Sequence, residues 1–420
     1  MISLYWRLLA GNPNFRLLWT AQIVSEIGDW FYALSVYSLL LTLTGNRAQS
    51  VGLAVVLQVL PQTFAAPTAG VVNDRVRRKA IMIGADLARC AIVLGMLLVR
   101  TPAMVWLVYP LLLVETIGAA FFEPARSSVI PNIVPAHEVT AANALSSITW
   151  SFSLAVGSTL GGLVAAAAGR DTVFLINAAS FLVSAALIRR MRFAEPHAAD
   201  APSLRARDLV NFKPVLEGVR YIRADRRRLA TVFVKGGIGL LGANNVVLPV
   251  LGARVFPVQL AGLAPERGAM LGMSVLLGAR GVGSLLGPLI AGAWAGDRQA
   301  RLRRGIVAGF LLAALGYLWV GASTSFVAAA AAVVLAHAGS STNWVFSTTL
   351  LQRGTEDRFR GRVFAADLGI CMLTISASSY AAGLAIDSGL PVRMFASAIG
   401  AVMFLPAAAW AAVLWATRRD

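Results

Sequence analysis

Two acidic residues in the first long apolar stretch of the chain are the strongest candidates for chemistry. Glu26 and Asp29 lie near the middle of residues 17–43, where a charge is costly if the stretch crosses a membrane. Their i, i+3 spacing places both carboxylates on one helix face. Because two close carboxylates in a low dielectric cannot both ionise cheaply, one of them takes up a proton readily, and Glu26 is the favoured candidate. The alternative is permanent pairing of one or both acids with a cation such as Arg280.

Further charged residues lie inside other apolar stretches. Glu115 falls toward the inner half of the fourth stretch and is a second candidate proton-binding group. Asp86 and Arg89 are one helical turn apart, so we expect them to neutralise each other or a neighbouring charge. Arg280 lies near the middle of the eighth stretch, where it would balance the acids of the first stretch or attract an anionic substrate.

The composition indicates a membrane protein with several spans. Of the 420 residues, 57% are hydrophobic and 14% are charged, whereas soluble proteins carry roughly 25% charged residues. The net charge of +17 does not point to nucleic acid, because the basic residues cluster in every second loop between apolar stretches. Cys90 and Cys371 are far apart in apolar segments, and no Cys or His cluster predicts a metal site. No catalytically spaced His, Cys or Ser pair supports an integral-membrane enzyme.

Twelve apolar stretches are long enough to cross the roughly 30 Å hydrocarbon core of a membrane. The basic residues are concentrated in the segments on the side of the two termini, which predicts that both termini are cytoplasmic. We expect transmembrane helices at 17–43, 51–72, 80–99, 102–122, 141–168, 171–188, 229–252, 268–294, 305–322, 326–351, 364–386 and 391–416.

The longest break separates six predicted spans from the other six. It predicts an N-terminal bundle at 1–192, a cytoplasmic linker at 193–228 and a C-terminal bundle at 229–420. Residues 211–228 show helical spacing of apolar residues beside several arginines, which favours a helix on the inner leaflet over a solvated linker helix. Asp297-Arg298, followed by further arginines, lies after the eighth span as a similar charged loop lies after the second, which indicates internal duplication.

The loop after the second span carries a specific charged motif. Gly70 is followed by Asp74-Arg75-Val76-Arg77-Arg78-Lys79 between two apolar runs, so this turn must lie at the water boundary. The segment resembles the signature loop of the major facilitator superfamily of secondary transporters. Arg77 stands where that family usually has glycine. We expect Gly70 to let the helix end approach a neighbour closely.

Other segments resemble one exporter branch of this superfamily, which includes enterobactin-type siderophore exporters and macrolide efflux proteins. The segments that carry this resemblance are Asn14-Phe15-Arg16-Leu17-Leu18-Trp19, Gly28-Asp29-Trp30, Pro124-Ala125-Arg126, Ala142-Asn143-Ala144-Leu145 and Arg360-Gly361-Arg362-Val363-Phe364.

The fifth span differs from the related antiporter motif at one position. Ser158 follows Gly157 where that motif has proline, so no proline kink is expected, while the glycines permit close helix contact.

The resemblance implies an all-α membrane protein with twelve transmembrane helices in two pseudo-symmetric six-helix bundles. It implies that spans one, four, seven and ten line a central cavity. It also implies that the loop at 74–79 closes the cytoplasmic side of this cavity by pairing with acids near spans four and eleven. The implied gating residues are Gly70, Asp74, Arg75, Arg78, Glu123 and Asp367. The candidate cavity residues are Trp30, Lys235, Asn244, Asn245, Arg280, His337 and Asn343. Packing is the alternative for His337, and helix–helix hydrogen bonding is the alternative for the Asn244-Asn245 pair.

We therefore expect a monomeric alternating-access carrier in the inner membrane of a bacterium. It would export a small amphipathic molecule, such as a drug, a siderophore or another natural product, by proton antiport, with the proton gradient as energy source and without a cofactor. An uptake or lipid-flipping carrier of the same fold is the alternative. An integral-membrane enzyme is a distant alternative.

Overall fold

The structure is a computed structural model that describes every residue except 1, 196–212, 260, 297 and 417–420. The described residues form helices joined by short turns, which confirms the all-α class. The chain divides into two compact units, one of residues 1–39 and 61–211 and the other of residues 40–60 and 212–420. α3 contributes its first half to unit 2 and its second half to unit 1. The predicted domain boundaries remain a prediction.

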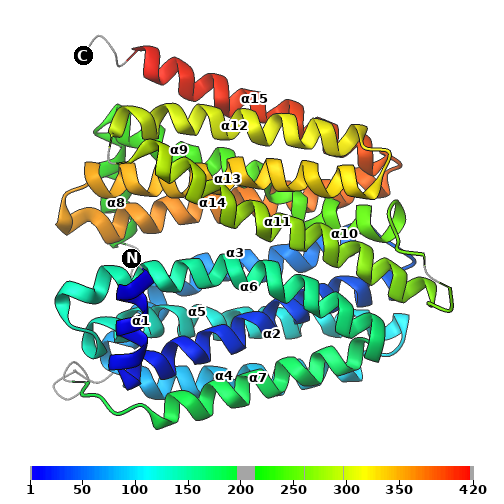
Figure 1. The fold of residues 1–420 in the computed structure, drawn as a ribbon, viewed down its shortest axis with the longest axis horizontal. Coiled ribbons are helices and arrows are strands. Elements are labelled where there is room, and N and C mark those ends of the chain that lie inside the picture. Colours follow the sequence, from blue (N-terminus) through cyan, green and yellow to red (C-terminus); the bar gives the residue numbers. More distant parts are fainter. Residues whose placement is uncertain (1, 196–212, 260, 297, 417–420) are drawn as a thin grey trace. The chain divides into compact units, whose positions relative to one another are not determined.

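Unit 1 is built mainly from long helices that lie side by side (Figure 1). α4 packs against both α5 and α7. The interior of the unit contains large apolar side chains such as Phe15, Met82 and Phe122. Its helices are α1 (Ile2–Gly11), α2 (Pro13–Leu43), α3 (Ala48–Arg75), α4 (Arg78–Gly95), α5 (Val108–Ile133), α6 (Val139–Ala168) and α7 (Arg170–Arg190).

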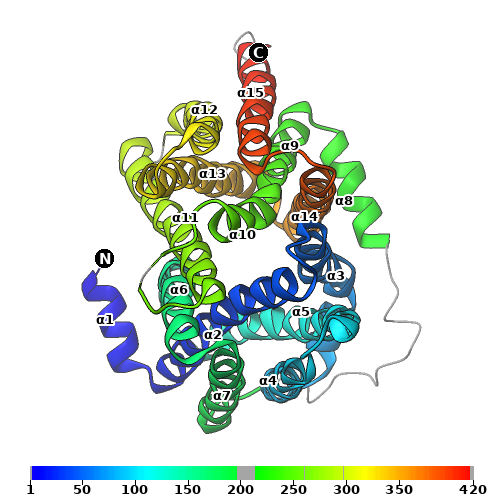
Figure 2. The same ribbon diagram turned by 90° about the vertical axis from the view of Figure 1, so that its right-hand side faces the viewer.

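Unit 2 has the same helical character, and Figure 2 views its long helices nearly end-on. α13 packs against α11 and α12, and α15 packs against α12. Glycines allow these close approaches: a Cβ added at Gly309 of α12 would overlap Gly339 and Asn343 of α13. The helices are α8 (Lys213–Arg223), α9 (Arg226–Leu240), α10 (Asn244–Arg254), α11 (Pro265–Ala295), α12 (Gln299–Ala322), α13 (Phe326–Gly354), α14 (Asp357–Asp387) and α15 (Val392–Ala416).

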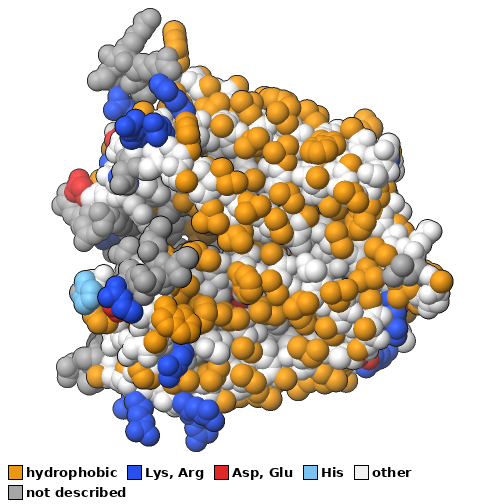
Figure 3. All heavy atoms as spheres, viewed as in Figure 1, with side chains coloured by type: hydrophobic (Ala, Val, Ile, Leu, Met, Phe, Trp, Pro, Cys, Tyr) orange, Lys and Arg blue, Asp and Glu red, His pale blue; other side chains and the backbone are white. Residues whose placement is uncertain are grey.

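Eleven helical segments in the described part of the chain are long and apolar enough to cross a membrane. The remaining long helix is α2, whose 31 residues have sufficient length but include Gln22, Ser25, Glu26 and Asp29. Hydrophobic side chains cover most of the face seen in Figure 3, and Lys and Arg side chains gather at the helix ends. This distribution is typical of helices whose middle portions lie in lipid.

Several predicted element ends differ from the observed ones. α5 continues to Ile133 instead of ending near residue 122, and it carries Pro124 and Pro131 inside the helix. The amphipathic helix predicted at 211–228 ends at Arg223, because the Asp225 side chain accepts hydrogen bonds from the Arg227 and Arg228 amides and begins α9. Two predicted features, the helix start near residue 211 and Asp297 of the second charged loop, lie outside the described residues.

The observed part of this amphipathic helix, α8, packs within unit 2. Its Ile222 is buried in a small cluster with Val232, Leu351 and Val363. Glu217 forms an ion pair with Arg362 of α14, with 2.7 Å between Oε2 and Nη1. The neighbouring Leu216 and Val219 remain exposed, so part of the apolar face stays available to a membrane surface.

Candidate functional site

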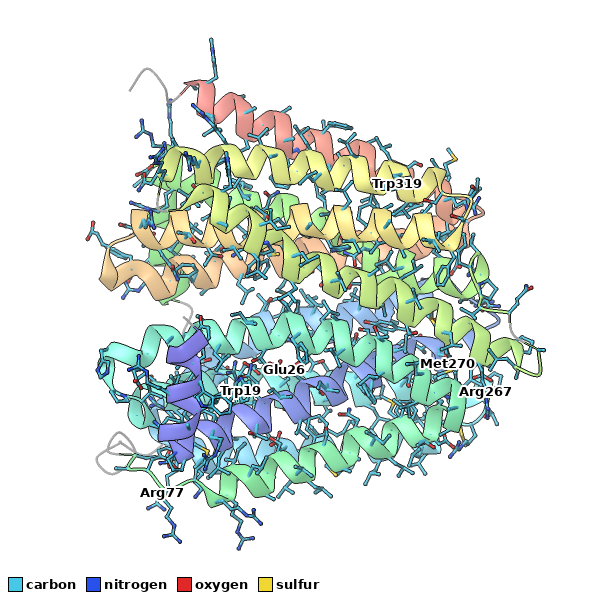
Figure 4. The ribbon with its side chains drawn as sticks, in the orientation of Figure 1. Trp19, Glu26, Arg77, Arg267, Met270 and Trp319 are labelled. Atoms are coloured by element: carbon cyan, nitrogen blue, oxygen red, sulfur yellow. The ribbon has the colours of Figure 1, made fainter. Side chains whose placement is uncertain are left out.

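The polar half of α2 is held between neighbouring helices by small residues. A Cβ added at Gly28 would overlap Asn177 and Ser180 of α7. Gly157 and Gly161 of α6 also lie close to α2, at Trp30 and Phe31, as the sequence predicted for these glycines. α6 runs without interruption through Ser158. In Figure 4, Glu26 lies well inside the length of α2, whereas Arg77 lies at the edge of the unit.

Asp29 belongs to a cluster in which one arginine is shared by two carboxylates. Arg89 Nη2 donates to both carboxylate oxygens of Asp29, at 2.9 and 2.8 Å. The same guanidinium lies 2.8 Å (Nε) and 2.7 Å (Nη2) from Glu115 Oε1. Its flat face covers the Phe181 ring at 4.2 Å. Arg89 and Glu115 are buried, but the Asp29 side chain is 33% exposed, so one carboxylate of the cluster is accessible.

This cluster decides between expected pairings. Of the two outcomes expected for Arg89, pairing with Asp86 or with a neighbouring charge, the structure shows the second, with Asp29 of α2 and Glu115 of α5. Arg280 was considered as the partner of the α2 acids, and it lies in unit 2, where its Nη1 donates to Asn245 Oδ1 at 2.6 Å. Asp86 is fully buried on the face of α4 that packs against α7. Helix packing, not sequence separation, decides which acid meets Arg89.

Glu26 belongs to a second network that also contains two carboxylates and one arginine. Gln22 Nε2 donates to Glu26 Oε1 at 2.7 Å, and Arg126 Nη1 donates to Gln22 Oε1 at 2.9 Å. Arg126 also pairs with Glu123, with 2.8 Å between Nη2 and Oε2. The other oxygen of Glu26 is buried without a hydrogen-bond partner in the described part of the chain. Two carboxylates again share one arginine, with Gln22 as the link.

Aromatic residues beside the α2 acids divide into two groups. Trp30 meets Trp150 of α6 edge to face, with 5.9 Å between ring centroids. Trp150 is largely exposed, so this pair presents an apolar surface near the acids. Phe31, Tyr32 and Tyr37 are buried in the packing of the unit.

In unit 2, two of the predicted site residues form a buried ion pair. Lys235 Nζ of α9 donates to Asp367 Oδ2 of α14 at 2.5 Å, and the two side chains are 4% and 1% exposed. The ammonium group also lies 4.2 Å above the Trp344 ring. Asp367 was expected to pair with the loop at 74–79, but its counterion in the structure is Lys235.

The other predicted cavity residues of unit 2 mostly serve helix packing. His337 Nε2 lies 3.0 Å from the Tyr317 hydroxyl and is buried. Asn343 is fully buried, where its amide can donate to the Ile306 carbonyl and accept from the Phe310 amide. Asn244 donates to the Leu241 carbonyl of the short 3-10 turn that precedes α10. Asn245 is only half-buried and holds Arg280, so these two residues are the accessible polar pair.

The basic residues of the loop at 74–79 contact other segments of unit 1. Arg78 Nη1 donates to the Ser128 carbonyl of α5 at 2.9 Å, and Lys79 Nζ donates to the Met191 carbonyl at 2.7 Å. Arg77 precedes α4 at φ −57° and ψ 115°, a conformation that requires no glycine. Asp74 is exposed. The close approach expected at Gly70 is wrong, since a Cβ there would meet no atom within 4 Å.

Gln22 and Arg126 were not identified as site residues from the sequence. Arg126 lies beyond the span predicted at 102–122, but α5 continues to Ile133 and buries it. Two spacings in the sequence were available as signals. Arg126 lies three residues after Glu123, and Gln22 lies four residues before Glu26, so each pair shares a helix face. No group of three or more His, Cys, Asp or Glu side chains that could hold a metal ion occurs in the described residues.

Comparison with known proteins gives a consistent result. A model of the Major Facilitator Superfamily matches residues 18–378. The uncharacterized MFS-type transporter YfiS of Bacillus subtilis is 27% identical over 328 residues, which cover 76% of this chain and 78% of YfiS. The putative bacilysin exporter BacE of Bacillus subtilis is 24% identical, covering 86% of each chain. Macrolide efflux protein A of Streptococcus pyogenes is 34% identical over 161 residues, which cover 37% of this chain and 38% of that protein.

Solved structures agree at the level of the fold. The nucleoside transporter NupG superposes with a TM-score of 0.71 at 10% identity, covering 95% of this chain and 98% of NupG. The POT family transporter PepTSo gives a TM-score of 0.68 at 11% identity, covering 97% and 98%. The helical architecture, the charged loop and the family match lead to one conclusion. The chain belongs to the major facilitator superfamily and is a multi-pass membrane transporter, not an enzyme.

Proposed function

We propose that this transporter exports a small amphipathic molecule by proton antiport and alternating access. The observation that carries the proposal is the sharing of Arg89 between Asp29 and Glu115. One cation and two carboxylates leave one excess negative charge, which is costly inside a membrane. Uptake of one proton neutralises the cluster, and release of the proton restores the charge. The accessible Asp29 carboxylate is the group through which the proton would enter.

The Glu26 network has the same charge count, because Arg126 faces both Glu123 and, through Gln22, Glu26. A proton on either network removes one buried charge. A basic group on a substrate could neutralise the same charge, so substrate and proton would displace each other, which is the requirement for antiport. The apolar surface of Trp30 and Trp150 next to these acids favours a compound that is also partly apolar.

The proposed setting is the inner membrane of a bacterium, with a monomeric chain and both termini cytoplasmic. The concentration of basic residues in alternate loops supports this orientation. The proton gradient would supply the energy, and the chemistry proposed requires no cofactor. The loop at 74–79 would then lie on the cytoplasmic side, where its contact with α5 is made and broken during the transport cycle.

The gating role of the loop predicts different effects for two neighbouring arginines. Arg78→Gln removes the charged donor to the Ser128 carbonyl, so we expect transport to fall about tenfold or more, because such bonds contribute about 1.5–3 kcal/mol. Arg77→Gln removes the same charge from an exposed position and is the matched control. Initial transport rates in inverted vesicles, normalised to the amount of protein, measure the difference. Equal rates for the two variants would show that the loop does not act as a gate and that its arginines only help to fix the orientation of the chain in the membrane.

The direction of transport is tested in cells. Deleting the gene is expected to raise the intracellular level of the substrate and to sensitise cells to a toxic one. Macrolides and bacilysin are the first compounds to test, because relatives bear these names. Accumulation is measured in deletion and overexpression strains, with the Asp29→Asn variant as the transport-deficient control. Lower accumulation in the deletion strain would instead identify an uptake carrier of the same fold.

A further inference from the structure

Asp86 of α4 is a buried acid that the transport steps described above do not use. It is 0% exposed, and the Ser184 hydroxyl of α7 lies beside it. Neither of its carboxyl oxygens has a hydrogen-bond partner in the described part of the chain. An ionised carboxylate without a partner is very costly inside a membrane. Asp86 therefore carries a proton in the state that the structure shows.

The charged groups that act on Asp86 do not balance a negative charge there. They are Arg89 on the same helix and Glu123 of α5, a helix that packs against α4. Arg89 is engaged by the two carboxylates of its own cluster. Glu123 is itself an acid and is paired with an arginine of α5. An ionised Asp86 would thus need Arg89 to leave its present partners.

Arg89 is placed so that it can reach Asp86. The two residues are three positions apart, which puts them on one face of α4, about 5 Å apart along the axis. Both side chains face α7: the Arg89 guanidinium covers the Phe181 ring at 4.2 Å, and Asp86 lies beside Ser184, three positions further along α7. The long side chain of arginine can therefore turn from the acids of α2 and α5 to Asp86 by rotation about its own bonds.

We propose that Asp86 is a third proton-binding carboxyl of the Arg89 cluster and holds the transported proton away from water. This inference rests on the proposed proton coupling, in which the proton enters at Asp29. In the transfer an O–H bond of Asp29 breaks and an O–H bond of Asp86 forms, while the Arg89 guanidinium moves from Asp86 to Asp29. One proton and one cation exchange places, so the net charge of the cluster is unchanged and no other reactant is needed.

The two carboxyls differ in their access to water, which gives the transfer its use. The Asp29 side chain is 33% exposed, so a proton there can return to water. A proton on Asp86, which is 0% exposed, is retained until Arg89 turns back. Asp29 is then the entry point and Asp86 the store. The structure, in which Arg89 pairs with Asp29, shows the stored state.

Infrared spectroscopy of the purified full-length chain in lipid tests the protonation of Asp86. A protonated carboxyl has a C=O stretch that an ionised carboxylate lacks, and the wild-type spectrum minus that of Asp86→Asn isolates the contribution of Asp86. We expect a protonated-carboxyl band near neutral pH that is lost in Asp86→Asn. Asp171→Asn, which removes a carboxyl from an exposed ion pair, is the control and should keep the band. Absence of the band from the wild type would overturn the proposal.

Variants of the other two acids test the exchange of partners. Asp29→Asn and Glu115→Gln each leave Arg89 one acid, so the Asp86 band should remain in each single variant. The double variant removes both present partners, so Arg89 should turn to Asp86, which then loses its proton and its band. Persistence of the band in the folded double variant would overturn the exchange. The wild-type comparison does not depend on this variant, so the proposal can fail even if the double variant does not fold.

These spectra involve neither a substrate nor a pH gradient. A failure of the export proposal would appear in the transport assays and leave the Asp86 band unchanged. A missing Asp86 band would refute the proton store and leave the direction of transport to be decided by those assays.

Discussion

Asp29→Asn is expected to reduce proton-driven transport to background while leaving the protein in the membrane. The substitution removes one of two carboxylates around Arg89, so the remaining Glu115 balances the guanidinium and no excess charge is left to bind a proton. Glu26→Gln should have the same effect on the second network, in which Glu123 alone would then balance Arg126. Substrate uptake into inverted vesicles with an imposed pH gradient measures this effect.

The control for this prediction is Asp171→Asn, which removes a carboxylate from the exposed Arg100–Asp171 pair of the same unit. Exposed pairs contribute roughly 0–1 kcal/mol, so this variant should transport normally. Exchange of labelled for unlabelled substrate without a pH gradient should survive in Asp29→Asn, because only the proton step is lost. If Asp29→Asn and Glu26→Gln both respond to the pH gradient as the wild type does, the proton-site proposal is wrong.

Lys235→Met is expected to destabilise the protein by about 3–5 kcal/mol, the usual effect of leaving a buried charge unpaired. Asp367 is its counterion, and the side chains are 4% and 1% exposed, so water cannot replace the lost ammonium group. The double variant Lys235→Met with Asp367→Leu removes both charges and should recover most of the lost stability. Thermal unfolding of the purified protein provides the measurement.

Arg362→Gln provides the matched control in unit 2. Its ion pair with Glu217 has side chains that are 36% and 52% exposed, so its loss should change stability by less than about 1 kcal/mol. A Lys235→Met variant no less stable than Arg362→Gln would contradict the assignment of a desolvated pair. A stable double variant that no longer transports would add a functional role to the structural one.

Much of the fold follows from local sequence patterns. Eleven of the twelve predicted spans coincide with apolar helical segments, because hydrophobic length is a local property of the chain. Glu26 and Asp29 of α2 were identified because charged residues near the middle of an apolar stretch are costly in a membrane. The end of α5 was misplaced, because the apolar stretch stops near residue 122, whereas the helix continues to Ile133 through Pro124 and Pro131, which a membrane helix tolerates when neighbouring groups satisfy the backbone.

The sequence by itself determined the membrane class, the family loop at 74–79 and the presence of acids inside apolar stretches. Only the tertiary structure decided which cation each acid meets. Arg89 reaches across to α2 and α5, past Asp86 on its own helix, and the buried Arg126 joins the Glu26 network through Gln22. An arginine side chain is long enough to reach acids on several neighbouring helices. Which acid it contacts depends on how closely the helices pack, and glycines such as Gly28 and Gly157 allow that close packing. Helix periodicity is encoded over a few residues, whereas the balance of buried charge is set by contacts between distant segments.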